Sequence, residues 1–294
     1  FTTESMSLAA EPLQEMNKMK SDCHMHTNFS SDAPKSSTPE VMIRKALEKG
    51  LERICFTDHY DKDYPFESTN GELDESAFIF DPEQYFKTLC PLKEKYEGRL
   101  EVRIGIELGL QTHLGEFYQR LTEQYPFDFV IGSAHVFAGK DPYYNCHVQD
   151  ADDEQEYRNA FVEMLEYVKA VDAFDALGHL DYVVRYGKEK ALHYSYRAFA
   201  DEIDEILKCI IAKGKALEFN TAGLKYGLGF AHPHPDVLKR YRELGGELLT
   251  VGADGHKPEH IGYAYDQADE ILKACGFRYY TEFKERKPQF IKIL

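Results

Sequence analysis

Several features are missing from this sequence, and each absence narrows the kind of protein it encodes. The 294 residues include no Trp, no Cys-x-x-Cys pair and no apolar run near the ~18 residues that a membrane-spanning helix needs. The six Cys stand singly along the chain, which argues against a disulfide framework and favours a reducing cytoplasm. We therefore expect a cytoplasmic protein without a membrane span, whose aromatic core is built from Tyr and Phe.

Positive charge is also scarce. The chain has 35 Lys and Arg against 51 Asp and Glu, a formal net charge of −16. Such a chain repels phosphate backbones, so nucleic acid is not an expected partner. No Gly-x-Gly-x-x-Gly follows the first apolar strand and there is no Gly-x-x-x-x-Gly-Lys-Ser/Thr, which disfavours nucleotide-binding sheets. A small phosphate ester can still bind where metal ions or a few Arg and Lys reverse the local field.

Short apolar runs alternate with longer helical patterns. Strands are expected at 22–26, 53–57, 101–106, 127–131, 173–177, 216–219 and 247–251, and helices at 38–50, 81–96, 153–171, 198–213, 235–244 and 265–275. This alternation predicts a parallel α/β architecture. A barrel is favoured because its functional residues lie at the C-terminal ends of its strands, where this chain has polar side chains. We expect one domain over residues 19–294, after a polar leader or expression remnant at 1–18.

His24 and His26 stand two residues apart at the end of the first predicted strand. Residues i and i+2 of a strand point to the same face, so both imidazoles face one space. Neutral imidazole is the commonest side-chain metal ligand. One His-x-His is more often a pair on a solvated strand than a metal site, so the interpretation depends on the other strand ends.

Those strand ends carry more imidazoles and carboxylates. With Asp32 on the first loop, the candidate ligands are His24, His26, Asp32, His59, Glu107, His135, His179, Asp254 and His256. Each alone could be structural, but together they predict a metal site at the C-terminal ends of the strands. They are too many for one ion, which takes about four to six ligands, so we expect two or three Zn, Mn or Fe ions. Clustered ions of this kind suit hydrolysis of a phosphate ester.

The strand-end motifs, taken together, resemble the polymerase-and-histidinol-phosphatase (PHP) family over residues 20–260. They are His24-Met-His26, Thr57-Asp-His59, Gly105-Ile-Glu107, Ser133-Ala-His135, Gly178-His-Leu-Asp181 and Ala253-Asp-Gly-His256. The segments 178–187 and 218–221 are similar to those of the histidinol-phosphatase branch. The resemblance implies a distorted (β/α)7 barrel that hydrolyses L-histidinol phosphate by attack of metal-bound hydroxide, in histidine biosynthesis.

The resemblance also implies a role for each residue. One metal would be held by His24, His26, Glu107 and Asp254, a second by Glu107, His135 and His179, and a third by Asp32, His59 and His256. Asp58 and Arg185 are expected to be catalytic. Arg185, Asn220 and Lys225 are expected to bind the substrate, with Lys225 taking the place of an Arg that some members carry in this segment.

Other assignments stay open at this point. Another PHP-type phosphoesterase, acting on nucleotides or other small esters, would use the same metal ligands. A module attached to a DNA polymerase is disfavoured by the charge and by the lack of polymerase sequence. His232-Pro233-His234 is a second His-x-His, but its prolines place it in a loop outside the main metal set. Asp58, Asp61 or Asp63 is expected to receive the ammonium group of the substrate, and the sequence does not indicate an oligomeric state.

Overall fold

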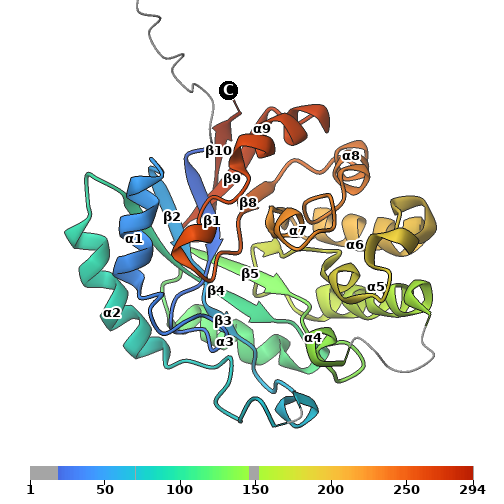
Figure 1. The fold of residues 1–294 in the computed structure, drawn as a ribbon, viewed down its shortest axis with the longest axis horizontal. Helices are drawn as coiled ribbons and strands as arrows, with labels where there is room; N and C mark the ends of the chain where they lie inside the picture. Colours follow the sequence, from blue (N-terminus) through green and yellow to red (C-terminus); the bar gives the residue numbers. More distant parts are fainter. Residues whose placement is uncertain (1–18, 70, 146–151, 294) are drawn as a thin grey trace, which may run out of the picture.

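A computed structural model describes residues 19–69, 71–145 and 152–293, so the segment expected to be a leader lies outside the described residues (Figure 1). The central sheet is parallel, in the order β1-β2-β4-β5-β6-β7-β8, and β3 pairs with β4 beyond the end of β2. Its strands are β1 (Ser21–Met25), β2 (Arg53–Phe56), β3 (His59–Tyr60), β4 (Glu101–Gly109), β5 (Phe129–Ser133), β6 (Ala176–Leu177), β7 (Ala216–Asn220) and β8 (Leu249–Gly252). A separate antiparallel hairpin follows, formed by β9 (Tyr279–Lys284) and β10 (Lys287–Lys292).

The two edges of the sheet meet, so the sheet is nearly closed into a barrel. The backbone N–H of Asp254 donates to the carbonyl of His24 at 2.8 Å, and the N–H of His26 donates to the carbonyl of Gly255 at 3.0 Å. These bonds join the end of β1 to the segment that follows β8. The predicted α/β barrel is therefore confirmed. Its closure brings the first strand-end motif, at His24 and His26, next to the last one, at Asp254 and His256.

Helices cover the outer face of the sheet (Figure 1). They are α1 (Pro39–Glu48), α2 (Pro82–Lys95), α3 (Gly115–Gln124), α5 (Asp153–Ala170), α6 (Ala200–Ala212), α8 (Pro235–Glu243) and α9 (Tyr265–Ala274). Two single-turn helices, α4 (Pro142–Asn145) and α7 (Ala222–Lys225), lie in the segments that follow β5 and β7. Asp81 and Asp152 cap α2 and α5, because their carboxylates accept hydrogen bonds from backbone amides of the first turn. These caps fix the residues at which the two helices begin.

Several elements differ from the sequence prediction, and three of them show why. Strand β4 is longer than expected, so Glu107 lies inside it, because β3 and β5 pair with that part of the strand on either side. Strand β6 is reduced to Ala176–Leu177. Helix α3 was not predicted at all; its buried Tyr118 and Leu121 pack against the core. The differences come from pairing and packing between elements, which local patterns do not contain.

Two apolar clusters lie on opposite faces of the strands. In β2, Ile54 and Phe56 belong to the large cluster under the helices, whereas Cys55 packs on the other face. The smaller, inner cluster contains Cys23, Cys55, Phe129, Ile131, Ala176, Ala216 and Phe283. Phe283 comes from β9 and stacks on Phe129 with ring centroids 5.2 Å apart. The C-terminal hairpin thus completes the packing inside the barrel.

A buried carboxylate anchors this hairpin to the sheet. Glu282 of β9 has 0% of its surface exposed. One of its oxygens lies 2.8 Å from Nε of Arg53 on β2 and 3.1 Å from Nη1 of Arg103 on β4. A buried carboxylate is tolerated only when it is paired, so these guanidinium groups hold the hairpin in place.

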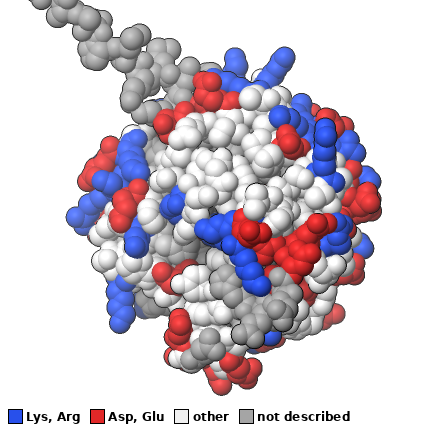
Figure 2. Space-filling view, turned by 45° about the vertical axis from the view of Figure 1, so that its right-hand side comes forward, with Lys and Arg blue, Asp and Glu red and all other residues white. Residues whose placement is uncertain are grey.

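Among the described residues, no helix combines the length and the apolar character needed to span a membrane. Figure 2 shows acidic and basic side chains interspersed on one face of the molecule. On that face, therefore, the acidic excess of the sequence does not form a single continuous patch.

Candidate metal centre

All nine predicted ligands meet at the carboxyl ends of the parallel strands. They come from β1, β3 and β4 and from the segments that follow β1, β5, β6 and β8: His24, His26, Asp32, His59, Glu107, His135, His179, Asp254 and His256. Asp32 is exposed and His256 is half-buried, while the other seven are buried. Parallel strands present their carboxyl ends on one rim of a barrel, which explains why residues from so much of the chain converge.

Four ligand atoms lie at the corners of a small polyhedron. Nε2 of His24 is 3.1 Å from Nε2 of His26, and these two atoms lie 3.3 and 3.5 Å from Oε2 of Glu107. Oδ1 of Asp254 is 3.8 Å from the first imidazole nitrogen and 3.3 Å from the second. Ligands bound at about 2.0–2.1 Å to a tetrahedral zinc ion lie roughly 3.4 Å apart, so this spacing suits one such ion.

The second oxygen of Glu107 faces another pair of imidazoles. Oε1 lies 3.3 Å from Nε2 of His135 and 3.0 Å from Nε2 of His179. The hydroxyl of Ser133 donates a hydrogen bond to the same oxygen at 2.6 Å. One carboxylate therefore presents its two oxygens to two different groups of histidines, which is the geometry of a bridging ligand.

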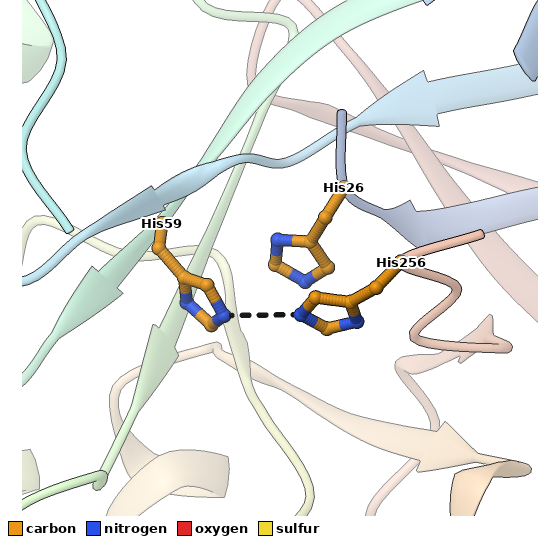
Figure 3. A group of neighbouring side chains, drawn as sticks. All are labelled: His26, His59 and His256. Atoms are coloured by element: carbon orange, nitrogen blue, oxygen red, sulfur yellow. Dashed lines mark hydrogen bonds between the residues drawn. The ribbon is translucent and has the colours of Figure 1, made fainter. Parts of the chain in front are cut away.

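A third group lies nearer the solvent. Figure 3 shows the rings of His26, His59 and His256 turned toward one another, with Nε2 of His59 and Nε2 of His256 3.4 Å apart. Oδ2 of Asp32 is 2.9 Å from Nε2 of His256 and 3.6 Å from Nε2 of His59. This carboxylate is the exposed member of the set, so the cluster is accessible to solvent on the side of Asp32.

Several of these histidines have a hydrogen-bond partner on the ring nitrogen that points away from the cluster. Nδ1 is paired in His24 with Glu218 (2.5 Å), in His135 with Asp61 (2.7 Å) and in His26 with Ser30 (3.1 Å). A partner on Nδ1 fixes the orientation of the ring and leaves Nε2 to face the cluster. This arrangement is typical of histidines that bind metals.

Burial and neighbouring charges shift the pKa values of these groups in opposite directions. Burial lowers the pKa of His24, but neighbouring carboxylates, Glu218 first among them, hold that pKa well above its usual value. Burial raises the pKa of Glu107, but the histidines around it, His24 first among them, bring that pKa well below its usual value. This carboxylate is therefore kept ionised, as a carboxylate that binds a metal must be.

The donor set fits divalent transition metals. The described residues form four overlapping groups of three possible ligands. Within each group the ligand atoms lie within 4.8 Å of one another, and all are imidazole nitrogens or carboxylate oxygens. Such mixed sets suit Zn, Mn or Fe. Oε2 of Glu107 is buried and has no hydrogen-bond partner among the described residues, a state that a bound cation would relieve.

Arg185 lies beside the ligands, in the short 3₁₀ segment Tyr182–Tyr186. Its Nη2 is 4.0 Å from Oδ2 of Asp254, and its guanidinium lies over the rings of Tyr182 and Tyr226, at 5.0 and 4.2 Å from their centroids. Nε and Nη2 are buried without hydrogen-bond partners among the described residues. Two donors of a fixed positive charge are thus available at the cluster.

The other two predicted substrate ligands also contact Asp254. Nζ of Lys225 donates to its backbone carbonyl at 3.2 Å and lies 4.9 Å from the ring centroid of Tyr226, and burial lowers the pKa of this lysine. Nδ2 of Asn220 donates to Oε2 of Glu218 at 3.1 Å and lies 3.5 Å from Oδ2 of Asp254. The amide of Asn220 is therefore already engaged within the site, while the lysine adds a second cation.

Asp58 is expected to be catalytic, but its backbone carbonyl accepts the N–H of Glu107 at 3.1 Å and its carboxylate reaches a predicted ligand through another residue. Its carboxylate accepts hydrogen bonds from the backbone N–H of Thr27 at 2.6 Å and from the hydroxyl of Ser30 at 2.8 Å. That hydroxyl oxygen also lies 3.1 Å from Nδ1 of His26. These contacts place Asp58 behind the ligand, where it fixes the loop after β1.

The three carboxylates considered for the substrate's ammonium group all have other partners. Asp58 binds the loop just described, and Asp61 is buried against His135. Asp63 is exposed and pairs with Lys62 at 2.5 Å and with Nε2 of His113 at 3.0 Å. Oδ1 of Asp61, however, is buried without a hydrogen-bond partner among the described residues and lies 4.0 Å from Nδ1 of His59, so Asp61 keeps a free oxygen beside the cluster. That one of the three carboxylates receives the ammonium group stays a prediction.

Glu218 is the main residue that the sequence prediction missed. One oxygen of this buried carboxylate contacts Nδ1 of His24, and the other accepts the backbone N–H of His179 at 2.8 Å. A signal was present, because Glu218 is a carboxylate within the apolar strand β7 and stands two residues before Asn220. That spacing places both side chains on the same face of the strand.

Comparisons with known proteins identify the family of this chain. The family model of the PHP domain matches residues 22–222. The chain belongs to the PHP domain family. Among relatives, it is 32% identical over 263 residues to a probable histidinol-phosphatase of Thermotoga maritima, covering 88% of this chain and 93% of the relative. It is also 30% identical over 260 residues to a probable histidinol-phosphatase of Clostridium acetobutylicum, covering 87% and 94%.

A solved structure is similar over nearly the whole PHP chain. The histidinol phosphate phosphatase of Lactococcus lactis, complexed with zinc, L-histidinol and phosphate, superposes with a TM-score of 0.80. It is 28% identical, and the match covers 92% of this chain and 98% of that one. The family resemblance expected from the motifs is confirmed. The similarity to the histidinol-phosphatase branch is confirmed as well, because these relatives and this solved structure are histidinol-phosphatases.

Proposed function

We propose that this PHP protein is a histidinol-phosphatase, which hydrolyses L-histidinol phosphate to L-histidinol and phosphate. One observation carries the proposal: Glu107 presents its two oxygens to separate imidazole groups, next to the unpartnered donors of Arg185. A metal-bridging carboxylate beside a guanidinium suits a phosphate monoester. The relatives named histidinol-phosphatase support the choice of this ester.

We assign the nine ligands to three ions, as the distances between their ligand atoms allow. The first set is His24, His26, Glu107 and Asp254, the second is Glu107, His135 and His179, and the third is Asp32, His59 and His256. When bound, divalent ions in these places polarise the phosphoryl group and make water a nucleophile at neutral pH. The number of ions, two or three, and the choice among Zn, Mn and Fe stay predictions.

The protein's own cations receive the phosphate. The guanidinium of Arg185 offers Nε and Nη2, a pair of donors that matches two phosphate oxygens and stays charged at any working pH. The rings of Tyr182 and Tyr226 hold this guanidinium in place before substrate arrives. Lys225 adds positive charge from the other side of Asp254, where its backbone contact fixes it.

Other residues keep the ligands in position. Asp58 acts through Ser30 on His26, so we propose a positioning role for it in place of direct contact with the reacting atoms. Asp61 and Glu218 do the same for His135 and His24. The single domain over 19–294, the cytoplasmic location and the absence of a nucleic-acid partner also remain predictions.

A panel of phosphate monoesters tests the assignment. Purified protein is assayed with Zn²⁺ or Mn²⁺ on L-histidinol phosphate, nucleoside monophosphates, sugar phosphates and p-nitrophenyl phosphate. We expect kcat/KM to be highest for L-histidinol phosphate by about tenfold or more. A comparable preference for an unrelated ester would refute the substrate while leaving the metal centre intact, and hydrolysis of none would refute both the substrate and the phosphatase assignment.

A further inference from the structure

One buried histidine lies outside the ligand set. His232 precedes α8 and has 0% of its surface exposed. Its Nδ1 is hydrogen-bonded to Oδ1 of Asp181, whose other oxygen accepts the backbone N–H of His234 at 2.8 Å. Because a carboxylate only accepts, it fixes the proton on Nδ1 and leaves a lone pair on Nε2. That Nε2 is buried and has no hydrogen-bond partner among the described residues.

A donor without an acceptor lies on the ligand His179. Nε2 of His179 faces Oε1 of Glu107 at 3.0 Å, so Nδ1 carries the proton when Nε2 binds a metal. That Nδ1 is buried and likewise has no hydrogen-bond partner in the part of the chain that the structure describes. His24, His26 and His135 each have a hydrogen-bond partner on Nδ1. Nδ1 of His59 also lacks one among the described residues, but it lies 2.9 Å from Oε2 of Glu107, so it already faces a carboxylate whereas Nδ1 of His179 does not.

The two histidines belong to one connected group. Asn220 pairs with His232 through both backbone hydrogen bonds, at 2.6 and 2.8 Å, while its side chain donates to Glu218. Glu218 in turn accepts the backbone N–H of His179, and Asp181 stands two residues further along the chain. Burial lowers the pKa of His232, and the charge of His179 adds to that effect, as expected for rings that are near each other.

We propose that His232 is a positioning residue of the metal centre. Its Nε2 accepts, through one buried water, the Nδ1 proton of His179, and Asp181 holds the accepting ring. Nη2 of Arg185 carries two N–H groups, so one of them supplies a further contact for that water while the other faces the phosphate. A buried water needs two to four polar partners, and Nε2 of His232, Nδ1 of His179 and Nη2 of Arg185 are buried atoms that lack a partner among the described residues.

We call the hydrogen-bonded chain from His179 through the water to His232 the relay. It affects how strongly His179 binds a metal. A hydrogen bond at Nδ1 orients the imidazole of His179 and increases the basicity of its Nε2, which strengthens binding of a metal. The inference rests on the proposed function only in so far as His179 is a metal ligand. It does not depend on which phosphate ester is the substrate.

Two substitutions separate the hydrogen bond from the packing. His232→Phe keeps a ring but removes the acceptor, whereas His232→Gln keeps a carbonyl oxygen that can accept. His234→Ala is the matched control, because His234 is half-buried and its Nδ1 only caps α8 by accepting the N–H of Asp236 at 3.1 Å. Zinc affinity of the full-length chain is measured by competition with a chelator. We expect a loss of about tenfold in the Phe variant, little loss in the Gln variant and none in the control.

Unmodified protein provides a test that no folding defect can obscure. In ¹⁵N-labelled, zinc-loaded protein, imidazole NMR should place the proton of His179 on Nδ1, slowly exchanging, and should show His232 unprotonated at Nε2. A proton on Nε2 of His232, or unchanged zinc affinity in a folded Phe variant, would overturn the relay. Neither measurement uses substrate, so failure to hydrolyse L-histidinol phosphate would refute the proposed function and leave the relay standing.

Discussion

Oε1 of Glu218 lies 2.5 Å from Nδ1 of His24, and both side chains are buried at the rim of the barrel. Its second oxygen accepts the backbone N–H of His179. A single carboxylate on β7 therefore supports ligands that follow from β1 and β6 and that belong to different parts of the cluster. We therefore expect the predicted metal centre to depend on this residue, although Glu218 is not one of the predicted ligands.

Replacing Glu218 by Gln should weaken metal binding. The amide keeps the shape of the side chain but loses the charge that holds the Nδ1 proton of His24. We expect the affinity for zinc to fall by about 10- to 100-fold, as is typical when an outer partner of a ligand is lost. Chelator competition measures this, with exposed Glu247→Gln as the control. Equal affinity in both variants would contradict the supporting role.

Removing a ligand should lower metal content and activity together. His135→Ala deletes one imidazole that faces Glu107, and elemental analysis should find fewer ions per chain than in wild type. His113→Ala is the control, because this exposed histidine pairs only with Asp63 among the described residues. Full metal loading with lost activity would instead assign His135 a direct catalytic role.

Arg185 should contribute to turnover without affecting the metals. Arg185→Ala removes two charged donors, each hydrogen bond to a charged group being worth about 1.5–3 kcal/mol, so kcat/KM for L-histidinol phosphate should fall by roughly 10- to 1000-fold. Metal content should stay unchanged, as should the activity of the exposed control Arg197→Ala. Wild-type kinetics in the Arg185 variant would show that the guanidinium does not bind phosphate.

The ion pairs of the C-terminal hairpin should matter for stability and not for chemistry. Glu282→Gln leaves Arg53 and Arg103 without their buried counter-charge, a change that costs about 3–5 kcal/mol in comparable sites. Urea unfolding should reveal the loss, whereas exposed Glu285→Gln should behave as wild type. Unchanged stability of the first variant would mean that water replaces the carboxylate at this place.

Asp204 of α6 should make stability depend on acidity. Its carboxylate accepts hydrogen bonds from Arg240 of α8 at 2.6 and 3.0 Å, and these bonds lower the pKa of Asp204 below its usual value. The stabilisation is therefore present above the unfolded pKa of about 3.9 and is lost as pH falls through the folded value. In metal-free protein, the difference in free energy of unfolding between wild type and Asp204→Asn should stay constant above about pH 5. It should shrink below about pH 4, and a constant difference there would refute the linkage.

The sequence by itself determined the repeating plan and the set of candidate ligands. Spacing two residues apart placed His24 and His26 on one side of a strand, and the succession of apolar runs implied a parallel barrel whose strand ends share one rim. That inference needs only the periods of strands and helices, which are local properties of the chain. For the same reason it missed α3 and the extension of β4, both of which depend on neighbouring elements.

Only the tertiary structure decided which residues support the ligands. Glu218 meets His24 across 194 residues, Asp61 meets His135 across 74 and Asp181 meets His232 across 51. No local period relates such positions, because each pairing depends on how the sheet closes and how the loops pack above it. A carboxylate in an apolar strand signals that a partner exists, but the closed barrel determines which imidazole it is.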